Sequence, residues 1–301
     1  MEPPIGLISG IERFAIHDGP GIRTLIFMKG CPLSCLWCSS PQTQRCTPEL
    51  LYDIRKCLKC GLCVEACATQ ALNLSPETGV FVDTDLCRSC GKCAADCPGQ
   101  ALELVGKEVT PDDLFQEVKK DSAFFRRSGG GVTVGGGEPA VQADFVARFL
   151  ALCKRQFIHT AVETCAYAHP EKLNQILEHA DLVYVDIKHI DDARHREITG
   201  ISNPSILKNI RRVAEVRPFI LRVPVVPGCN DTTDNFQAIA EFALSLGKNL
   251  LKIDLLPYHR LGMHNYIRMG RDYSLKDLEP PGQEQMERLR QIVKDIGVAV
   301  T

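Results

Sequence analysis

The sequence lacks a strong excess of charge of either sign and lacks any long apolar run. Its 301 residues carry a formal net charge of −2, so no extended basic surface is expected and nucleic acid is not an expected partner. No stretch of about 18 apolar residues is present, so no membrane-spanning helix is expected. Residues 1–10 also lack a basic segment followed by an apolar core, the pattern of a secretory signal. We therefore expect a cytoplasmic protein with no membrane partner.

Cysteine, by contrast, is abundant, with 15 residues. In a small secreted chain this content would suggest disulfide bonds, but this chain is large and has no export signal. Eleven of the cysteines fall into three closely spaced groups, and close spacing of reduced thiols favours metal binding. The other four match no ligand spacing, and we expect them to be packing residues: Cys46, Cys153, Cys165 and Cys229.

The first group lies in the loop 30–39, where Cys31, Cys35 and Cys38 have the spacing C-x3-C-x2-C. Three thiolates on one short loop can hold an iron–sulfur cube and leave one iron open for chemistry. The alternatives are three small buried hydrophobic residues or a zinc site, although a closed zinc site needs a fourth ligand and usually contains pairs of C-x2-C. Trp37, the only tryptophan, either packs beside the loop or shields it and flanks a bound ligand. The triplet alone does not decide among these readings.

Residues 46–106 contain an internal duplication. The spacing C-x2-C-x2-C-x3-C occurs twice, 30 residues apart, and each copy is followed by Gln-Ala-Leu, at Gln70 and at Gln100. Bacterial ferredoxins have this pattern, in which three cysteines of one copy and the last cysteine of the other bind each [4Fe–4S] cluster. Ala68 departs from it, because a proline such as Pro98 often follows the run.

Zinc ribbons are the alternative for this segment, and the repetition of the four-cysteine run with its flanking residues disfavours them. The expected ligand sets are therefore Cys57, Cys60, Cys63 and Cys97 for one cluster, and Cys67, Cys87, Cys90 and Cys93 for the other.

Outside the duplication, strand-like and helix-like segments alternate. A capped helix is expected from Thr110 to about Ser122, and residues 1–20 read as a preamble that ends in a turn. The alternation predicts a parallel sheet with right-handed crossovers, and six β/α units suit an incomplete barrel. The barrel would comprise residues 1–45 and 107–301, and residues 46–106 would be inserted in its first unit. Strands are expected near 22–28, 132–134, 160–163, 182–187, 219–226 and 250–256.

Polar residues follow the carboxyl ends of these strands, the rim where parallel barrels bind ligands. Asp186 and Lys188 lie two apart on one strand and face the same side. They either bind ribose hydroxyls and a carboxylate of a ligand, or pair with each other. His259 is equally a core histidine or a ligand contact. The strand ends are, in order, the cysteine loop, 135–139, 163–165, 186–188, Arg222 with 227–228, and 257–259.

Together and in this order, the motifs resemble those of a radical S-adenosylmethionine (SAM) enzyme, and more narrowly of a glycyl radical enzyme activating enzyme similar to pyruvate formate-lyase activase. The resemblance covers nearly the whole chain. It is strongest to the branch with a ferredoxin-like two-cluster insert, which includes activators of glycerol dehydratase, choline lyase and arylacetate decarboxylases. It implies an α/β fold, a partial (β/α)6 barrel with this insert. The motifs are HDGPGIRT at 17–24, the cysteine loop, the duplication, GGGEP at 135–139, DIK at 186–188, VVPG at 225–228 and LLPYH at 255–259.

The resemblance also implies cofactors and their contacts. Cys31, Cys35 and Cys38 would hold a [4Fe–4S] cluster whose open iron binds the amino and carboxylate groups of SAM, and two auxiliary [4Fe–4S] clusters would lie in the insert. Some members bind a monovalent cation with acids on the third and fourth strands, and here Glu163 stands where an aspartate is expected. The implied SAM contacts are Trp37, Cys38, Ser39, Gly136, Gly137, Asp186, Ile187, Lys188 and His259.

The implied reaction is reductive cleavage of SAM to a 5′-deoxyadenosyl radical, which abstracts hydrogen from one glycine Cα of a partner glycyl radical enzyme. It requires a low-potential electron donor such as flavodoxin or ferredoxin, and the insert would pass electrons inward. It needs no general base, so neither His259 nor Glu138 is given an acid or base role. We expect a monomer. The alternatives are a radical SAM enzyme acting directly on a small molecule or peptide, and an electron-transfer protein of polyferredoxin type.

Overall fold

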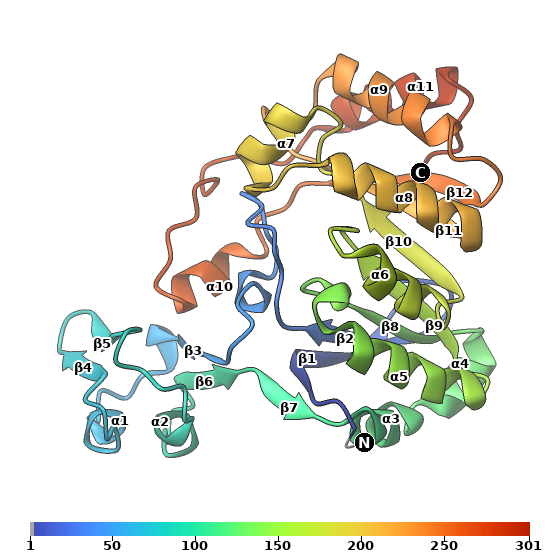
Figure 1. Ribbon diagram of the computed structural model, residues 1–301. Helices are drawn as coiled ribbons and strands as arrows, with labels where there is room; N and C mark the ends of the chain where they lie inside the picture. The colour runs from blue at the N-terminus through green and yellow to red at the C-terminus, as the bar shows by residue number, and fades with distance from the viewer. Residues whose placement is uncertain (1–2) are drawn as a thin grey trace.

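An eight-stranded sheet organises the computed structural model, which describes residues 3–301 (Figure 1). Six neighbouring strands run parallel in the order β12-β11-β10-β9-β8-β2. They are the six strands expected from the sequence, with boundaries within two residues, so the predicted parallel α/β sheet is confirmed. Their bounds are β2 (Arg23–Met28), β8 (Gly131–Gly136), β9 (His159–Thr164), β10 (Leu182–Asp186), β11 (Phe219–Val225) and β12 (Leu250–Pro257).

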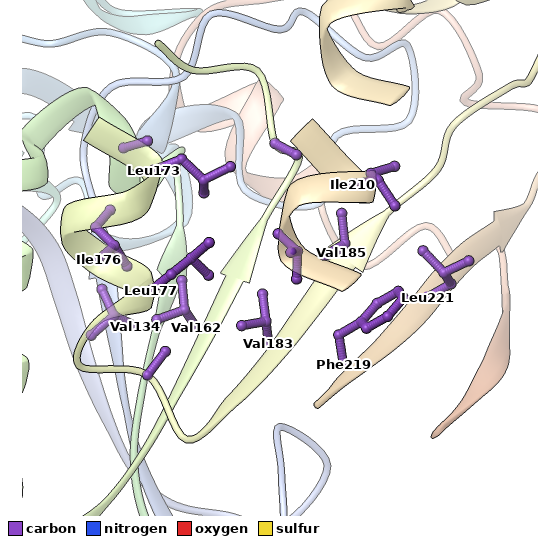
Figure 2. Close-up of a cluster of buried hydrophobic side chains, with 14 of the residues drawn as sticks. Val134, Val162, Leu173, Ile176, Leu177, Val183, Val185, Ile210, Phe219 and Leu221 are labelled. Carbon is purple, nitrogen blue, oxygen red and sulfur yellow. The ribbon is translucent and has the colours of Figure 1, made fainter. Parts of the chain in front are cut away.

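Helices between the strands bury apolar side chains against the sheet, which gives the main hydrophobic core. They are α5 (Ala143–Arg155), α6 (Pro170–Leu177), α8 (Pro204–Val216), α9 (Thr233–Leu244) and, after the last strand, α11 (Gln283–Asp295). Helix α7 (Asp192–Thr199) instead buries Ile198 in a separate apolar cluster. Figure 2 shows Leu173, Ile176 and Leu177 of α6 and Ile210 of α8 beside Val134, Val162, Val183 and Val185 of the strands. Within the part of the chain that is described, no helix is both long and apolar enough to cross a bilayer.

The capped helix expected at Thr110 is α3 (Pro111–Lys119), and the Thr110 hydroxyl accepts a hydrogen bond from the Asp113 amide at 3.1 Å. It ends at Lys119, earlier than expected, and α4 (Ser122–Ser128) follows it. Asp121 explains the break, because its buried carboxylate turns inward and accepts hydrogen bonds from Arg13 and Thr24.

Residues 1–20 are more than a preamble, which corrects the expectation from the sequence. Half of them form β1 (Gly6–Ala15), an antiparallel strand beside β2 that also pairs with β7 (Lys107–Val109). The pairing with β2 shifts register twice, between Ile8 and Gly10 and between Arg13 and Ala15. Such bulged outer strands lack a clean two-residue alternation, so no regular strand pattern marks this one in the sequence.

The duplicated segment (residues 46–106) projects from one side of the sheet (Figure 1). Its two copies fold alike, since Lys59 and Ser89, and likewise Gln70 and Gln100, have left-handed φ angles at matching positions. The duplication is therefore visible in the backbone as well as in the cysteine spacing. Its elements are β3 (Glu49–Tyr52) paired with β6 (Leu102–Val105), β4 (Leu72–Ser75) paired with β5 (Gly79–Val82), and the short helices η2 (Ile54–Lys56), α1 (Leu62–Glu65) and α2 (Lys92–Ala95).

Ion pairs join the duplicated segment to the rest of the molecule. Glu49 of β3 accepts hydrogen bonds from Lys29 at 3.0 Å and from Arg271 at 2.7 Å. The Lys29 side chain is completely buried, and the Glu49 side chain nearly so. A second pair, Arg268 with Glu103 at 2.5 Å, lies in a more exposed place. The junction therefore depends on one buried carboxylate that neutralises a buried lysine.

Candidate active site

The loop that follows β2 carries Cys31, Cys35 and Cys38, and backbone hydrogen bonds fix its course. The amide of Cys31 donates to Gln44 O at 2.9 Å, and farther along the loop the amide of Ser34 donates to Thr199 O at 2.9 Å. The loop is thus held between η1 (Pro41–Thr43) on one side and the end of α7 on the other. Both anchors are backbone contacts, so neither of them uses any of the three thiols.

The environment of these thiols suits metal binding. Burial raises the pKa of Cys35 to about 12 and that of Cys38 to about 11, whereas the neighbouring Cys165 thiol lowers the pKa of Cys31 despite burial. In such a place a metal keeps coordinating thiols ionised. Among residues 3–301 no three Cys, His, Asp or Glu side chains already converge in metal-binding geometry, so the argument rests on this donor set and its surroundings.

The glycine run after β8 packs directly on the start of the cysteine loop. The Gly137 amide donates to Met28 O at 3.0 Å, and the Glu138 amide donates to Gly30 O at 2.8 Å. A side chain at Gly137 would place its Cβ 2.5 Å from Gly30 O, so only glycine allows the two backbones to lie this close. The run therefore places no side chain between its own backbone and the start of the cysteine loop.

Glu138 connects the ends of β8 and β9 through hydrogen bonds of its side chain. Its buried carboxylate accepts hydrogen bonds from the Thr164 hydroxyl at 2.8 Å and from the Cys165 amide at 2.8 Å. The Cys165 thiol donates to the same carboxylate at 2.9 Å. Burial raises the pKa of Glu138 above its ordinary value. These contacts make Glu138 a positioning residue, in keeping with the absence of an assigned acid or base role.

Asp186 and Lys188 meet at the end of β10. Lys188 Nζ donates to Asp186 Oδ2 at 2.9 Å, which is the mutual ion pair that the sequence allowed. Burial opposes the charge on Lys188, but the Asp186 carboxylate raises the pKa of Lys188 above its ordinary value. Ile187 between them is buried, and its amide donates to Arg222 O at 2.9 Å. The pair thus presents one charge of each sign at the rim.

Glu163 of β9 is paired with Arg222 of β11, across the intervening strand. Arg222 Nη1 donates to Glu163 Oε1 at 2.5 Å, and its guanidinium lies 3.9 Å from the ring centre of Tyr184. Burial raises the pKa of Glu163 to about 7, although Arg222 opposes the shift. The sequence singled out both residues as members of the rim but gave no indication that they would pair.

The fold and the cysteine loop together match a known protein family. The model of the Radical SAM superfamily matches residues 25–243. The chain belongs to that superfamily. It follows that SAM and a [4Fe–4S] cluster are its cofactors and that it is an oxidoreductase-type enzyme.

Similar proteins assign the chain to a smaller family within this superfamily. An isethionate sulfite-lyase activating enzyme of Nitratidesulfovibrio vulgaris is 41% identical, covering 96% of this chain and 95% of that protein. A trans-4-hydroxy-L-proline dehydratase activating enzyme of Clostridioides difficile is 40% identical, covering 95% of each chain. A choline trimethylamine-lyase activating enzyme of Oleidesulfovibrio alaskensis is 38% identical, covering 96% of this chain and 94% of that one. Within the radical SAM enzymes, this chain therefore belongs to the glycyl radical enzyme activating enzymes.

In this radical SAM protein, Trp37 is part of an aromatic cover over the cysteine loop. It is 8% exposed and packs in a cluster with Tyr258, Tyr266 and Tyr273, which Cys35 and Cys38 also contact. The Tyr258 and Tyr273 hydroxyls are 2.9 Å apart. The tyrosines lie around α10 (Met263–Arg268), beyond the last strand. Sequence reasoning missed this cover, because the tyrosines have no regular spacing.

Ser39 and His259, two further expected SAM contacts, lie in different surroundings. Ser39 adjoins Cys38 in the loop, whereas His259 is exposed, so a core histidine is excluded there. Of the four cysteines outside the three groups, Cys153 and Cys229 pack against apolar clusters, as expected. Cys165 is buried and contacts Cys31 and Glu138. Cys46 is exposed, so the expectation that it is a packing residue is wrong.

In the duplicated segment the eight cysteines line two separate cavities, each with cysteines from both copies. The amide of Ala71 donates to Cys67 Sγ at 3.3 Å, and the amide of Ala101 donates to Cys97 Sγ at 3.3 Å, so the last cysteine of each copy is held in the same way. One cavity is lined by Cys57, Cys60, Cys63 and Cys97, and the other by Cys67, Cys87, Cys90 and Cys93.

Proposed function

We propose that this chain activates a partner glycyl radical enzyme. When bound, the cluster supplies one electron that cleaves SAM to a 5′-deoxyadenosyl radical, which removes a hydrogen from one glycine Cα of the partner. The observation that carries the proposal is the meeting of the cysteine loop, the glycine run and the Asp186–Lys188 pair at one edge of the sheet. The full-length similarity to activating enzymes supports it, and no relative named above is an enzyme acting directly on a metabolite.

The residues of the site have separate tasks in this proposal. Cys31, Cys35 and Cys38 hold the cluster and leave one iron for the methionine end of SAM. Backbone carbonyls of Gly136 and Gly137 would meet its amino end, because neither residue has a side chain to stand in the way. Asp186, Ile187, Lys188 and His259 bind ribose and carboxylate, and Trp37, Cys38 and Ser39 contact SAM through the loop. The aromatic cover around Trp37 excludes water from the radical.

The residues do not fit the monovalent cation that the resemblance allows. The acid on the third strand, Glu163, already accepts a hydrogen bond from Arg222 at 2.5 Å. A fixed guanidinium therefore supplies the positive charge that a cation would bring to this carboxylate, and we give such a cation no role.

Lys188 offers a test of the SAM contacts. We expect Lys188→Met to raise the SAM dissociation constant about 10–100-fold, because a charged hydrogen bond contributes about 1.5–3 kcal/mol. The measurement is equilibrium dialysis of SAM with the cluster-loaded protein. Lys252→Met is the matched control, since Lys252 pairs with Asp254 on β12 and is more exposed. Equal SAM affinity of Lys188→Met and the unaltered protein would make the Asp186 pair purely structural.

We further propose that residues 46–106 form a ferredoxin-like domain inserted into a barrel of residues 1–45 and 107–301. The two cavities support this, because each contains three cysteines of one copy and the last cysteine of the other, as the ferredoxin pattern requires. The domain would bind two auxiliary [4Fe–4S] clusters. Their electrons would come from a low-potential donor such as flavodoxin or ferredoxin.

Cys60 and Cys90 test this relay, because they are the exposed members of the two sets. We expect serine at either position to reduce activation by a protein reductant at least about tenfold, and activation by dithionite much less, since a small reductant can reach the cluster without the relay. The rate of glycyl radical formation with each reductant is the measurement. Cys46→Ser, an exposed cysteine outside both sets, is the control. An equal loss with both reductants would make the segment structural or a docking surface.

The proposed function itself is tested with anaerobically reconstituted protein. Mixed with SAM and dithionite, it should release 5′-deoxyadenosine, and a glycyl radical signal should appear only when a glycyl radical enzyme is added. Relatives of nearly equal sequence identity are named as activators of different enzymes, so we propose a class of partner and not one enzyme. The chain would act as a monomer in the cytoplasm. Release of 5′-deoxyadenosine without any radical on candidate partners would favour direct action on a small molecule.

A further inference from the structure

The first cavity of the duplicated segment contains the hydroxyl group of a tyrosine. Tyr52, the last residue of β3, lines the cavity together with Cys57, Cys60, Cys63 and Cys97. Its hydroxyl oxygen is buried and has no hydrogen-bond partner among the described residues. An unpaired buried hydroxyl is unfavourable, so phenylalanine would serve better here if the hydroxyl had no acceptor.

Neighbouring residues hold the hydroxyl in this place. The backbone of Tyr52 pairs with Leu102 in the β3–β6 ladder, which fixes the side chain from its base. At the other end, a Cβ on Gly79 would lie 2.0 Å from the Tyr52 hydroxyl oxygen, so the ring reaches directly over this glycine at the start of β5. The orientation of the phenol is therefore imposed from both ends of the side chain.

Sulfur is the acceptor available to this hydroxyl. Lys59, whose amine donates to Pro76 O and cannot accept a hydrogen bond, is the other polar side chain described in the lining. The rest are apolar, among them Leu74, Val80 and Leu102. A phenol carries its proton at neutral pH, so the Tyr52 hydroxyl can donate it in a hydrogen bond. Cys57 Sγ already accepts a hydrogen bond from the Lys59 amide at 3.4 Å.

The duplication provides an internal comparison. Position 82, which lies 30 residues after Tyr52 and five before the next cysteine run, is Val82. The second cavity therefore has no phenol at the matching position. Its hydroxyls are those of Thr69, 3.6 Å from Cys67 Sγ, and Ser89, which donates to Pro48 O at 2.9 Å. The matching residues of the other cavity are Gly99 and Lys59. The two cavities thus differ in their hydroxyl groups.

We propose that Tyr52 donates a hydrogen bond to a sulfur of the cluster held by Cys57, Cys60, Cys63 and Cys97, and thereby raises the reduction potential of that cluster alone. This rests on the proposed function, which places a cluster in this cavity. Reduction adds negative charge to the cluster and its sulfurs, so a donor aimed at them stabilises the reduced form. Tyr52 would make two otherwise duplicated clusters unequal in potential.

The test is a potentiometric titration followed by electron paramagnetic resonance. It uses the full chain with Cys31, Cys35 and Cys38 replaced by alanine, so that only the auxiliary clusters contribute. Tyr52→Phe should lower the reduction potential of one of the two clusters by about 59 mV, since each cluster takes one electron. At a fixed potential, this is about a tenfold decrease in the ratio of reduced to oxidised cluster. Thr69→Val, the control at the other cavity, should leave the potential of that cluster unchanged.

Two unchanged transitions in a fully iron-loaded Tyr52→Phe protein would overturn the proposal, and so would equal shifts of both. If the variant loses its cluster, the full chain with Tyr52 in place is labelled with fluorinated tyrosine instead. A fluorinated phenol is more acidic and therefore a stronger hydrogen-bond donor, so it should raise the reduction potential of the same cluster. An unchanged potential would overturn the proposal. Absence of iron from residues 46–106 in the labelled protein would instead refute the auxiliary clusters of the proposed function, and Tyr52 with them.

Discussion

Cys35→Ser is expected to abolish SAM cleavage and to remove about one third of the bound iron, since the protein would hold three clusters of equal iron content. Cys35 is the central cysteine of the loop, and the aromatic cluster that contains Trp37 and Tyr266 packs against it. A serine hydroxyl there is a far weaker iron ligand than a thiolate, so the cluster should be lost. The measurements are iron per chain and 5′-deoxyadenosine released under dithionite.

Cys229→Ser is the matched control, because Cys229 packs against the same aromatic cluster but belongs to no cysteine group. It should keep both the iron and the cleavage activity. If Cys35→Ser retained full iron and cleaved SAM normally, the loop could not be the place where the reactive cluster is held.

Glu49→Leu is expected to destabilise the protein by about 3–5 kcal/mol, because it leaves a buried charge without its partner. The charge is that of Lys29, whose side chain has no exposed surface. Among residues 3–301, the other acceptor for Lys29 Nζ is Gln42 O, at 2.6 Å. Burial already lowers the pKa of Lys29, and Glu49 opposes that shift. Urea unfolding of the cluster-loaded protein measures the change.

Two comparisons make this prediction specific to the buried pair. Glu103→Gln removes the exposed ion pair with Arg268 at the same junction and should cost less than about 1 kcal/mol. Replacing Lys29 by methionine together with Glu49→Leu should recover most of the loss, since two apolar side chains replace both charges. A loss below about 1 kcal/mol for Glu49→Leu alone would show that the junction does not depend on this pair.

The parallel sheet could be predicted from the sequence because its strands other than the edge strand β12 are largely buried on both faces and read as short apolar runs. Strand β1 could not. It contains Glu12 and Arg13, is bulged twice, and is held by contacts to distant residues such as the pair of Arg13 with Glu117 at 2.5 Å. Its conformation depends on partners about a hundred residues away, and no local pattern reports them.

The candidate site divides in the same way. Cysteine spacing is a local property dictated by ligand geometry, so the three groups were visible in the sequence. The pair of Glu163 and Arg222 depends instead on the registers of β9, β10 and β11, in which Glu163 lies beside Tyr184 and Arg222 beside Asp186. The tyrosines around α10 likewise reach the cysteine loop only through the path of the chain after β12.

The same reasoning explains Tyr52. Its sequence position shows only that one copy of the duplication has a tyrosine where the other has Val82. That its hydroxyl is buried and unpaired becomes apparent only when β3, Gly79 and the cysteine cavity are assembled. Differences between two copies of one motif are therefore useful guides to function once the fold is known.

The account depends on one iron at the Cys31 loop being left for SAM, and hyperfine spectroscopy of the reduced protein tests this most directly. With SAM labelled by nitrogen-15 in its amino group and oxygen-17 in its carboxylate, both labels should couple to the cluster, and Cys35→Ser should eliminate both couplings. Zinc bound at Cys31, Cys35 and Cys38, or an iron cluster whose spectrum does not respond to SAM, would contradict the account.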